Sequence, residues 1–268
     1  MNFSHILIKR ILVLFLVFSC LKISGNIPQK NIGFAVDSLK QKDVVIEEKS
    51  FPIANYIIPA TFISYGIATR FSTSLQDFDH TINEKIKSNV SRKYTFDDYL
   101  QYVTPVAMYT LNLCGVKSEN NLRDQTIILA NSALLAGITV VCVKNTTKVP
   151  RPDSGAKNSF PSGHTTTAFV GAHILFKEYK NTSPWIGVAG YLSAATVGTF
   201  RMINQRHWFS DVIMGAGIGI VCVEISYLML PMYQRLFERN KINSNNGAMM
   251  ISPIVGNDYY AVGLILVF

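Results

Sequence analysis

Six apolar segments, separated by charged stretches, occupy most of the chain between residues 51 and 230. Most are 17 to 19 residues long and carry no formal charge, although Glu224 interrupts the last one. They are long enough to form helices and rich in the small residues that let helices approach closely. This pattern predicts an all-α bundle of about six core helices. The segments are Phe51–Ala68, Leu100–Val116, Gln125–Val143, His164–Phe176, Ser183–Phe200 and Val212–Leu230.

Two further stretches follow different patterns. Residues 72–98 read as an amphipathic helix, which we expect to lie across the bundle. Residues 243–268 are rich in β-branched and aromatic side chains around Gly256-Asn257-Asp258, and they predict a small C-terminal β-hairpin. The end of the chain, YYAVGLILVF, resembles the closing strand of an outer-membrane barrel, but no series of alternating strands precedes it, so a barrel is not expected.

The N-terminus has the order of a secretory signal peptide. Lys9 and Arg10 precede an apolar run from Ile11 to Leu21, which is short for a membrane span of about 20 residues. We therefore expect residues 1–25 to be a signal peptide or N-terminal anchor, and residues 26–50 to be a polar leader. The helical domain is then residues 51–232, and the hairpin is residues 243–268.

Composition narrows the class of partner. Hydrophobic residues make up 49% of the 268 positions and charged residues only 16%, with a net charge of +8. A basic excess fits an anionic lipid or substrate; without a run of five lysines and arginines we expect no nucleic-acid partner. Cys114, Cys142 and Cys222 lie in apolar segments without metal-binding spacing, so we expect buried thiols, no disulfide and no zinc site.

Three polar clusters stand at the ends of the apolar segments. In the third cluster, Arg201 precedes His207 and Asp211. His207 and Asp211 are four residues apart, so on a helix the carboxylate reaches one imidazole nitrogen and leaves the other free as a nucleophile or base. Arg201 can hold an oxyanion through two hydrogen bonds.

The other two clusters supply an anion-binding loop. Ser162 follows a proline as a natural N-cap, with Gly163 and His164 in the first turn of the next helix, whose free N–H groups favour an anion. Lys144 ends an apolar helix, and Arg151 is stiffened by a proline on each side. Together the clusters predict a site for a tetrahedral oxyanion such as phosphate. No group of acidic residues is arranged for magnesium, so we expect no metal and no cofactor.

The same residues resemble the three-part signature of the type 2 phosphatidic acid phosphatase superfamily, which includes lipid phosphatases, bacterial acid phosphatases and vanadium haloperoxidases. The resemblance covers about residues 51–230 and implies an all-helical core with metal-independent phosphate hydrolysis through a phosphohistidine. One position departs, because Phe200 stands where the family usually has a serine before the arginine. The departure removes one polar contact.

The resemblance also implies a role for each site residue. His207 attacks phosphorus, Asp211 orients it, and His164 protonates the leaving oxygen and then activates water. The residues that bind the phosphate oxygens are Lys144, Arg151, Ser162, Gly163 and Arg201. Residues 153–160 belong to no motif, and we expect them to influence substrate choice.

The clusters do not choose the phosphoester. Long uncharged segments favour a membrane lipid in a bacterial cell envelope, with lipid A, undecaprenyl pyrophosphate and phosphatidylglycerophosphate as substrates. The barrel-like last strand favours lipid A slightly. The alternatives are a soluble periplasmic acid phosphatase acting on small phosphoesters, a vanadium-dependent haloperoxidase and an inactive binding protein. The last would need a damaged site, and every reactive position is intact.

Membrane topology leaves two locations open. If all six segments span, a periplasm-facing site places residues 22–50 in the cytoplasm, whereas a cleaved signal peptide would place them outside. The protein is therefore expected either in the inner membrane with a periplasm-facing site or free in the periplasm. Phe51–Ala68 contains two prolines and is the weakest of the predicted spans.

Overall fold

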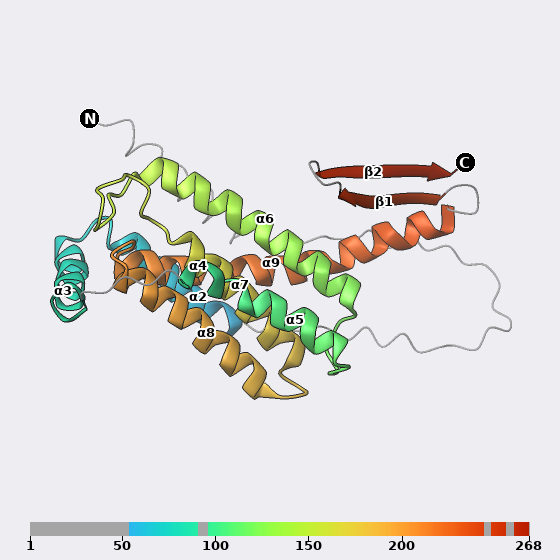
Figure 1. The fold of residues 1–268 in the computed structure, drawn as a ribbon, viewed down its shortest axis with the longest axis horizontal. Coiled ribbons are helices and arrows are strands. Elements are labelled where there is room, and N and C mark those ends of the chain that lie inside the picture. Colours follow the sequence, from blue (N-terminus) through green and yellow to red (C-terminus); the bar gives the residue numbers. More distant parts are fainter. Residues whose placement is uncertain (1–53, 91–95, 244–247, 256–259, 268) are drawn as a thin grey trace, which may run out of the picture. The chain divides into compact units, whose positions relative to one another are not determined.

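The computed structural model describes residues 54–90, 96–243, 248–255 and 260–267, all within one unit of the chain, Ala54–Phe268. The predicted signal peptide or anchor and the polar leader lie outside the described residues. Within these ranges the chain forms eight helices followed by two strands (Figure 1). They are α2 (Ala54–Ala68), α3 (Thr73–Asn89), α4 (Asp97–Leu100), α5 (Val103–Leu113), α6 (Leu122–Thr147), α7 (Gly163–Tyr179), α8 (Pro184–Ile203), α9 (Phe209–Asn243), β1 (Ala248–Val255) and β2 (Tyr260–Val267).

Helix α7 lies inside the bundle and packs against α5, α6, α8 and α9. Its core side chains include Val170 and Ile174, which are buried with Ile218 of α9. Two of its contacts depend on glycine. A Cβ on Gly171 would collide with the side chain of Thr104 on α5, and one on Gly219 would lie 2.7 Å from the carbonyl oxygen of Thr166. The predicted all-α bundle is confirmed.

The long helices alternate in direction, so that all three polar clusters meet at one end of the bundle. Lys144 lies in the last turn of α6 and Arg201 in the last turn of α8, while Ser162 caps the start of α7 and Asp211 lies in the first turn of α9. We call this the site end. The opposite end, where α5 and α7 finish and α6 begins, is the far end.

Two predicted helices have different limits in the structure. The stretch 72–98 forms α3 only as far as Asn89, where Val90 has an extended backbone. A separate four-residue helix, α4, follows at Asp97. The segment Leu100–Val116 likewise becomes helical again only at Val103, as α5. The two acidic residues that begin α4, Asp97 and Asp98, lie at the site end.

Helix α3 lies across the site end of the bundle, as expected (Figure 1). It packs against α8 and α9. The buried carboxylate of Asp79 accepts hydrogen bonds from the backbone N–H and the hydroxyl of Ser210, in the first turn of α9. This contact binds otherwise unpaired donors at the start of a helix and fixes the segment that carries His207.

The C-terminal segment contains two strands. Strands β1 and β2 pair in antiparallel register, with Ala248 opposite Val267 and Val255 opposite Tyr260. The predicted turn residues fall in the interval 256–259, between the strands, and lie outside the described residues.

Among the described residues, three helices have the length and composition of membrane spans: Leu122–Thr147, Pro184–Ile203 and Phe209–Leu236. Helix α7 is shorter, with 17 residues, or about 25 Å at 1.5 Å per residue, and is not among them. Helix α2, with Pro59 inside it, is not among the three.

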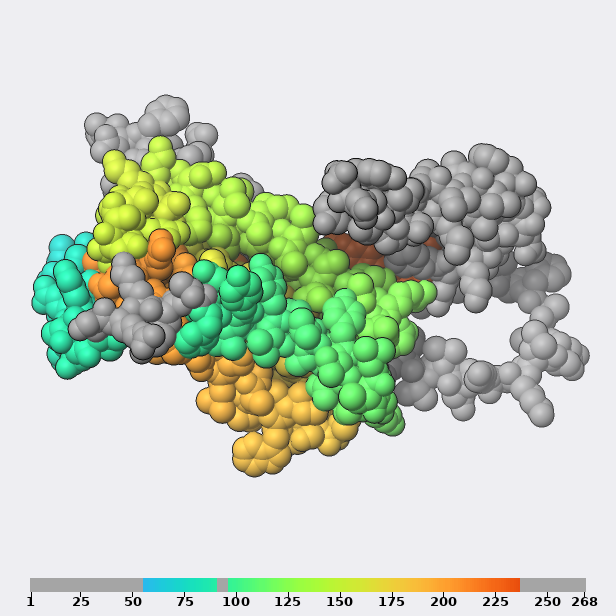
Figure 2. Space-filling view, viewed as in Figure 1, coloured from blue at the N-terminus to red at the C-terminus, as the bar shows by residue number. Residues whose placement is uncertain are grey.

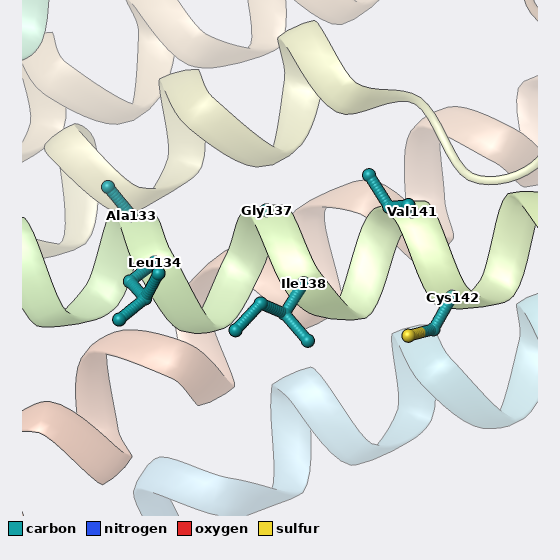
Figure 3. Close-up of a pocket in the computed structure, with 6 residues that line it drawn as sticks. All are labelled: Ala133, Leu134, Gly137, Ile138, Val141 and Cys142. Carbon is teal, nitrogen blue, oxygen red and sulfur yellow. The ribbon is translucent and has the colours of Figure 1, made fainter.

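The outer face of α6 is apolar and exposed. In Figure 2, α6 forms the yellow-green band across the visible surface. Figure 3 shows six of its residues in one strip, among them Leu134, Ile138 and Val141, which are 62%, 55% and 56% exposed. Cys142 in this strip and Cys114 are exposed, so the expectation that both thiols are buried is wrong; of the three cysteines in the described residues, Cys222 is buried. An apolar segment need not face the protein core.

Candidate active site

His207 and Asp211 form the pair that their spacing predicts. The Nδ1 of His207 lies 3.3 Å from Oδ2 of Asp211, and the two side chains are 2% and 0% exposed. A carboxylate only accepts, so Nδ1 is the donor and the lone pair of the neutral ring is on Nε2. Within the described residues Nε2 makes no hydrogen bond.

Asp211 is fixed by two further donors. Its Oδ2 accepts from the hydroxyl of Ser159 and, at 2.9 Å, from the backbone N–H of Trp208. Its Oδ1 is buried and has no hydrogen-bond partner in the described part of the chain. The indole of Trp208 donates to the Pro150 carbonyl at 2.9 Å, so the loop between α6 and α7 is attached to the start of α9.

Burial lowers the pKa of His207 below its ordinary value of 6.5, and the charges of Lys144 and Arg151 act in the same direction. The carboxylate of Asp211 opposes this shift without reversing it. His207 is therefore neutral near pH 7, with an available lone pair on Nε2.

Ser162 connects the second cluster to the third. Its hydroxyl accepts from the backbone N–H of Thr165 at 3.4 Å as the N-cap of α7, and its own N–H donates to the Asp211 carbonyl at 3.0 Å. Gly163 is the first residue of the helix. The positive end of α7 therefore lies beside the His207–Asp211 pair.

Lys144 and Arg151 are held by the loop that follows them. The Nζ of Lys144 donates to the carbonyls of Asn158 and Ser159 at 2.5 and 3.2 Å. The Nε of Arg151 donates to the side-chain oxygen of Asn158 at 2.7 Å. Asn158 and Ser159 lie in the stretch 153–160 that the sequence assigned to no motif. Their contacts fix the cations and Asp211; an influence on substrate choice stays a prediction.

His164 and Arg201 face a pair of acidic residues that sequence reasoning missed. The Nη1 of Arg201 lies 2.9 Å from a carboxylate oxygen of both Asp97 and Asp98. The same oxygen of Asp98 lies 3.0 Å from Nε2 of His164. Both acids are on α4, more than one hundred residues before Arg201.

Electrostatic effects link the cations across the site end. The pKa of Arg151 is lowered by burial and next by the positive charge of Arg201. Such coupling requires the two guanidinium groups to be near neighbours. The eight residues that the sequence predicted lie at the site end, on α6, the loop after α6, the start of α7, the end of α8 and the segment from His207 to Asp211. His207 precedes the first residue of α9, so the expectation that it shares a helix with Asp211 is wrong; the contact forms where the chain enters the helix. Nothing in the described ranges gathers three or more His, Cys, Asp or Glu side chains as metal ligands.

The residues around this site match a known family. Residues 125–235 match the sequence model of the PAP2 superfamily, and all eight predicted site residues fall inside that segment. We call this matched segment, residues 125–235, the PAP2 domain. PAP2 is the same superfamily of type 2 phosphatidic acid phosphatases that the three sequence clusters resemble.

A curated relative of the PAP2 domain is the lipid A 1-phosphatase of Porphyromonas gingivalis. It is 37% identical over 152 residues, which are 56% of this chain. The match covers 34% of that protein, so the chain spans about a third of the length of the relative.

Two solved structures overlap with the PAP2 domain. One is Aquifex aeolicus LpxE, with 24% identity, a TM-score of 0.42, and coverage of 57% of this chain and 93% of that one. The other is a transmembrane PAP2 type phosphatidylglycerolphosphate phosphatase from Bacillus subtilis, with 19% identity, a TM-score of 0.42, and coverage of 63% and 94%.

The position at which the chain departs from the PAP2 signature has a structural role. The ring of Phe200 meets the ring of Phe96 edge to face, with centroids 4.4 Å apart. Phe200 directly precedes Arg201, and Phe96 directly precedes Asp97. An aromatic contact between α8 and the start of α4 therefore lies next to the ion pairs between Arg201 and the acidic residues.

Proposed function

We propose that the PAP2 domain is a phosphatase that removes a phosphate group from a membrane lipid through a phosphohistidine at His207. One observation carries the proposal: a buried, neutral histidine, oriented through Nδ1 by Asp211, has a free Nε2 beside a helix N-terminus and the charges of Lys144 and Arg151. A nucleophile among groups that bind an oxyanion is suited to phosphoryl transfer.

In the first step, Nε2 of His207 attacks phosphorus and forms a P–N bond while the bond from phosphorus to the lipid oxygen breaks. His164 gives its proton to the departing oxygen, which leaves as the lipid alcohol. Asp211 stabilises the positive charge that develops on the imidazole ring of His207.

In the second step, His164 takes a proton from water, and the water oxygen attacks phosphorus. The P–N bond breaks, His207 regains its lone pair, and inorganic phosphate leaves. Throughout, Lys144, Arg151 and Arg201 neutralise the phosphate oxygens, together with Ser162 and the backbone N–H of Gly163 at the start of α7.

The apolar surface supports a lipid substrate over the soluble periplasmic alternative. The exposed strip on α6 and the exposed apolar side chains of α8 would face water in a soluble protein, which rarely exposes a continuous apolar patch. Lys144 lies on the same helix as the strip, so a lipid in the bilayer would present its phosphate near the site. The relative named lipid A 1-phosphatase supports lipid A among the three lipids considered.

Phosphate release from purified protein tests this function. Lipid A, undecaprenyl pyrophosphate, phosphatidylglycerophosphate and a soluble phosphoester should be compared under the same detergent. We expect turnover of lipid A, loss of it in His207→Gln, and retention in Glu84→Gln, which alters an exposed residue on α3. Turnover of the soluble ester alone would contradict a lipid phosphatase.

Chelation tests the metal-independent part of the proposal. Activity should persist in EDTA and fall when vanadate is added, because vanadate takes the place of the phosphate. Loss of activity in EDTA that magnesium restores would contradict it.

We place the site end on the periplasmic face of the inner membrane, and cysteine labelling tests this. Cys114 is exposed and follows α5 at the far end, whereas Lys157 is exposed in the site-end loop. In intact spheroplasts, an impermeant maleimide should label Lys157→Cys but not Cys114. The reverse pattern would place the site in the cytoplasm, and release of the protein by carbonate would exclude an integral bundle.

A further inference from the structure

One carboxylate oxygen of Asp98 occupies a position between two groups of the proposed phosphate site. It lies 3.0 Å from Nε2 of His164 and 2.9 Å from Nη1 of Arg201. In the proposed function these atoms face phosphate, His164 as the proton donor and Arg201 as an oxygen ligand. A phosphate oxygen and a carboxylate oxygen accept hydrogen bonds from such donors in the same geometry.

Asp97, the neighbouring acid, provides a contrast. Its carboxylate also lies 2.9 Å from Nη1 of Arg201, but its side chain is 1% exposed, whereas that of Asp98 is 55% exposed. Asp97 is enclosed and fixes the arginine. Asp98 can turn its side chain into solvent by rotation about its own bonds, while Asp97 stays in place.

Arg201 retains a donor that neither acid satisfies. Its Nε is buried and has no hydrogen-bond partner within the described residues, and its side chain is only 7% exposed. At present a single Asp98 oxygen contacts both groups, whereas a tetrahedral anion would bring several oxygens. A phosphate group there could bind both His164 and the unpaired N–H of Arg201.

We propose that Asp98 is an internal anion that holds the place of a phosphate oxygen in the ligand-free protein and leaves it when a phosphate group binds. The proposal rests on the proposed function for the identity of the ligand. Asp98 would keep the His164–Arg201 pair oriented and neutralised between turnovers. It would also compete with the product phosphate and so favour its release.

Binding of inorganic phosphate to the full-length protein tests the proposal without any turnover. The affinity can be measured by isothermal titration calorimetry in detergent at pH 7 for the wild type and Asp98→Asn. The substitution keeps the side-chain shape and removes the competing charge. We expect phosphate to bind about fivefold more tightly to Asp98→Asn, the gain expected for release of one partly exposed ion pair.

A matched variant separates occupancy of this position from the general effect of removing a negative charge. Asp153 is also an acid at the site end; it pairs with Arg206 at 3.5 Å and acts on the pKa of Arg151. Asp153→Asn should change phosphate affinity by less than about twofold, because screening by salt weakens a charge that does not occupy the phosphate position. Asp97→Asn should weaken binding, because Arg201 loses its enclosed partner.

Unchanged or weaker phosphate binding in Asp98→Asn would overturn the proposal, and so would an equal gain in Asp153→Asn. Failure of the proposed function gives a different result, namely no phosphate release from any lipid by the wild type. A vanadate-bound structure adds a direct check: Asp98 should lie beyond hydrogen-bond distance of His164, and an intact 3.0 Å contact would contradict the displacement.

Discussion

The two ends of the bundle both carry buried polar side chains, but they use them differently. At the far end, Glu178 accepts from the backbone and side-chain nitrogens of Asn120 at 2.9 and 2.8 Å and from the Tyr227 hydroxyl at 2.5 Å. Nearby, the side-chain nitrogen of Asn112 donates to Gln125 at 2.7 Å and lies 2.9 Å from the Tyr179 hydroxyl. These polar groups satisfy one another.

At the site end the hydrogen bonds are incomplete. The Nε of Arg201 and Oδ1 of Asp211 are buried without partners among the described residues, and Nε2 of His207 has none either. Unpaired buried groups cost stability, whereas paired ones support it. The comparison teaches that the far end holds the helices together, while the site end keeps free the atoms that a phosphate group would engage.

The largest expected effect is loss of chemistry at the site end. His207→Gln should abolish lipid phosphate release, and His164→Asn should lower kcat by about 10²–10⁴, the contribution typical of a positioned acid–base group. Neither change should lower the free energy of unfolding by more than about 1 kcal/mol, because these side chains are not fully satisfied now. Phosphate-release kinetics and denaturant unfolding in mild detergent measure the two quantities.

The far end should respond in the opposite way. Glu178→Ala removes the acceptor shared by Asn120 and Tyr227, so it should lower the free energy of unfolding by about 3 kcal/mol. At a temperature where the variant is folded, kcat should match that of the wild type. If Glu178→Ala left the free energy of unfolding unchanged and lowered kcat, the proposed difference between the two ends would be wrong.

The eight site residues could be predicted from the sequence because they fall into three short clusters. The longest cluster, from Arg201 to Asp211, spans eleven residues, so the members of each cluster are neighbours in the chain before the bundle assembles. Asp98 and Ser159 were not predictable, because their partners lie 103 residues away in Arg201 and 52 residues away in Asp211. Only the folded bundle brings such residues together.

The apolar pattern predicted the helical bundle, but it did not predict which face of each helix is buried. An apolar helix against lipid and one in a protein core have similar compositions. Cys142 on the exposed strip of α6 and Cys222 in the core of α9 therefore look alike in the sequence. The break between α4 and α5 was missed because an apolar run continues through it.

A moderate effect is expected in the pH dependence of kcat/KM. His207 must be neutral to attack, and burial lowers its pKa, so activity should rise with pH through a value below 6.5. His164 must be protonated, and its pKa is lowered by burial and Arg201, while Asp98 and Asp97 raise it, so activity should fall as pH rises further. The optimum should lie on the acid side of 6.5.

Asp98→Asn sharpens this prediction, because it removes an anion that raises the pKa of His164. The basic limb of the profile should move to lower pH while the acid limb stays. An optimum above pH 7 in the wild type, or a basic limb that moves upward in the variant, would contradict these assignments.

The smallest expected effect is at Phe200. Phe200→Ser restores the residue usual in the family and removes the edge-to-face contact with Phe96, which is worth about 0.5–1.5 kcal/mol. We expect KM to rise severalfold with little change in kcat, because Arg201 remains but α4 is held less firmly. Phe200→Leu, which keeps an apolar contact, should lie between the two.

The most direct test of the central claim is to trap the phosphorylated protein during turnover of a ³²P-labelled lipid phosphate by rapid quenching. The account predicts an acid-labile, alkali-stable phosphoprotein whose label maps to the peptide containing His207 and is absent from His207→Gln. Label on another residue, or steady turnover with no labelled protein at any quench time, would contradict it.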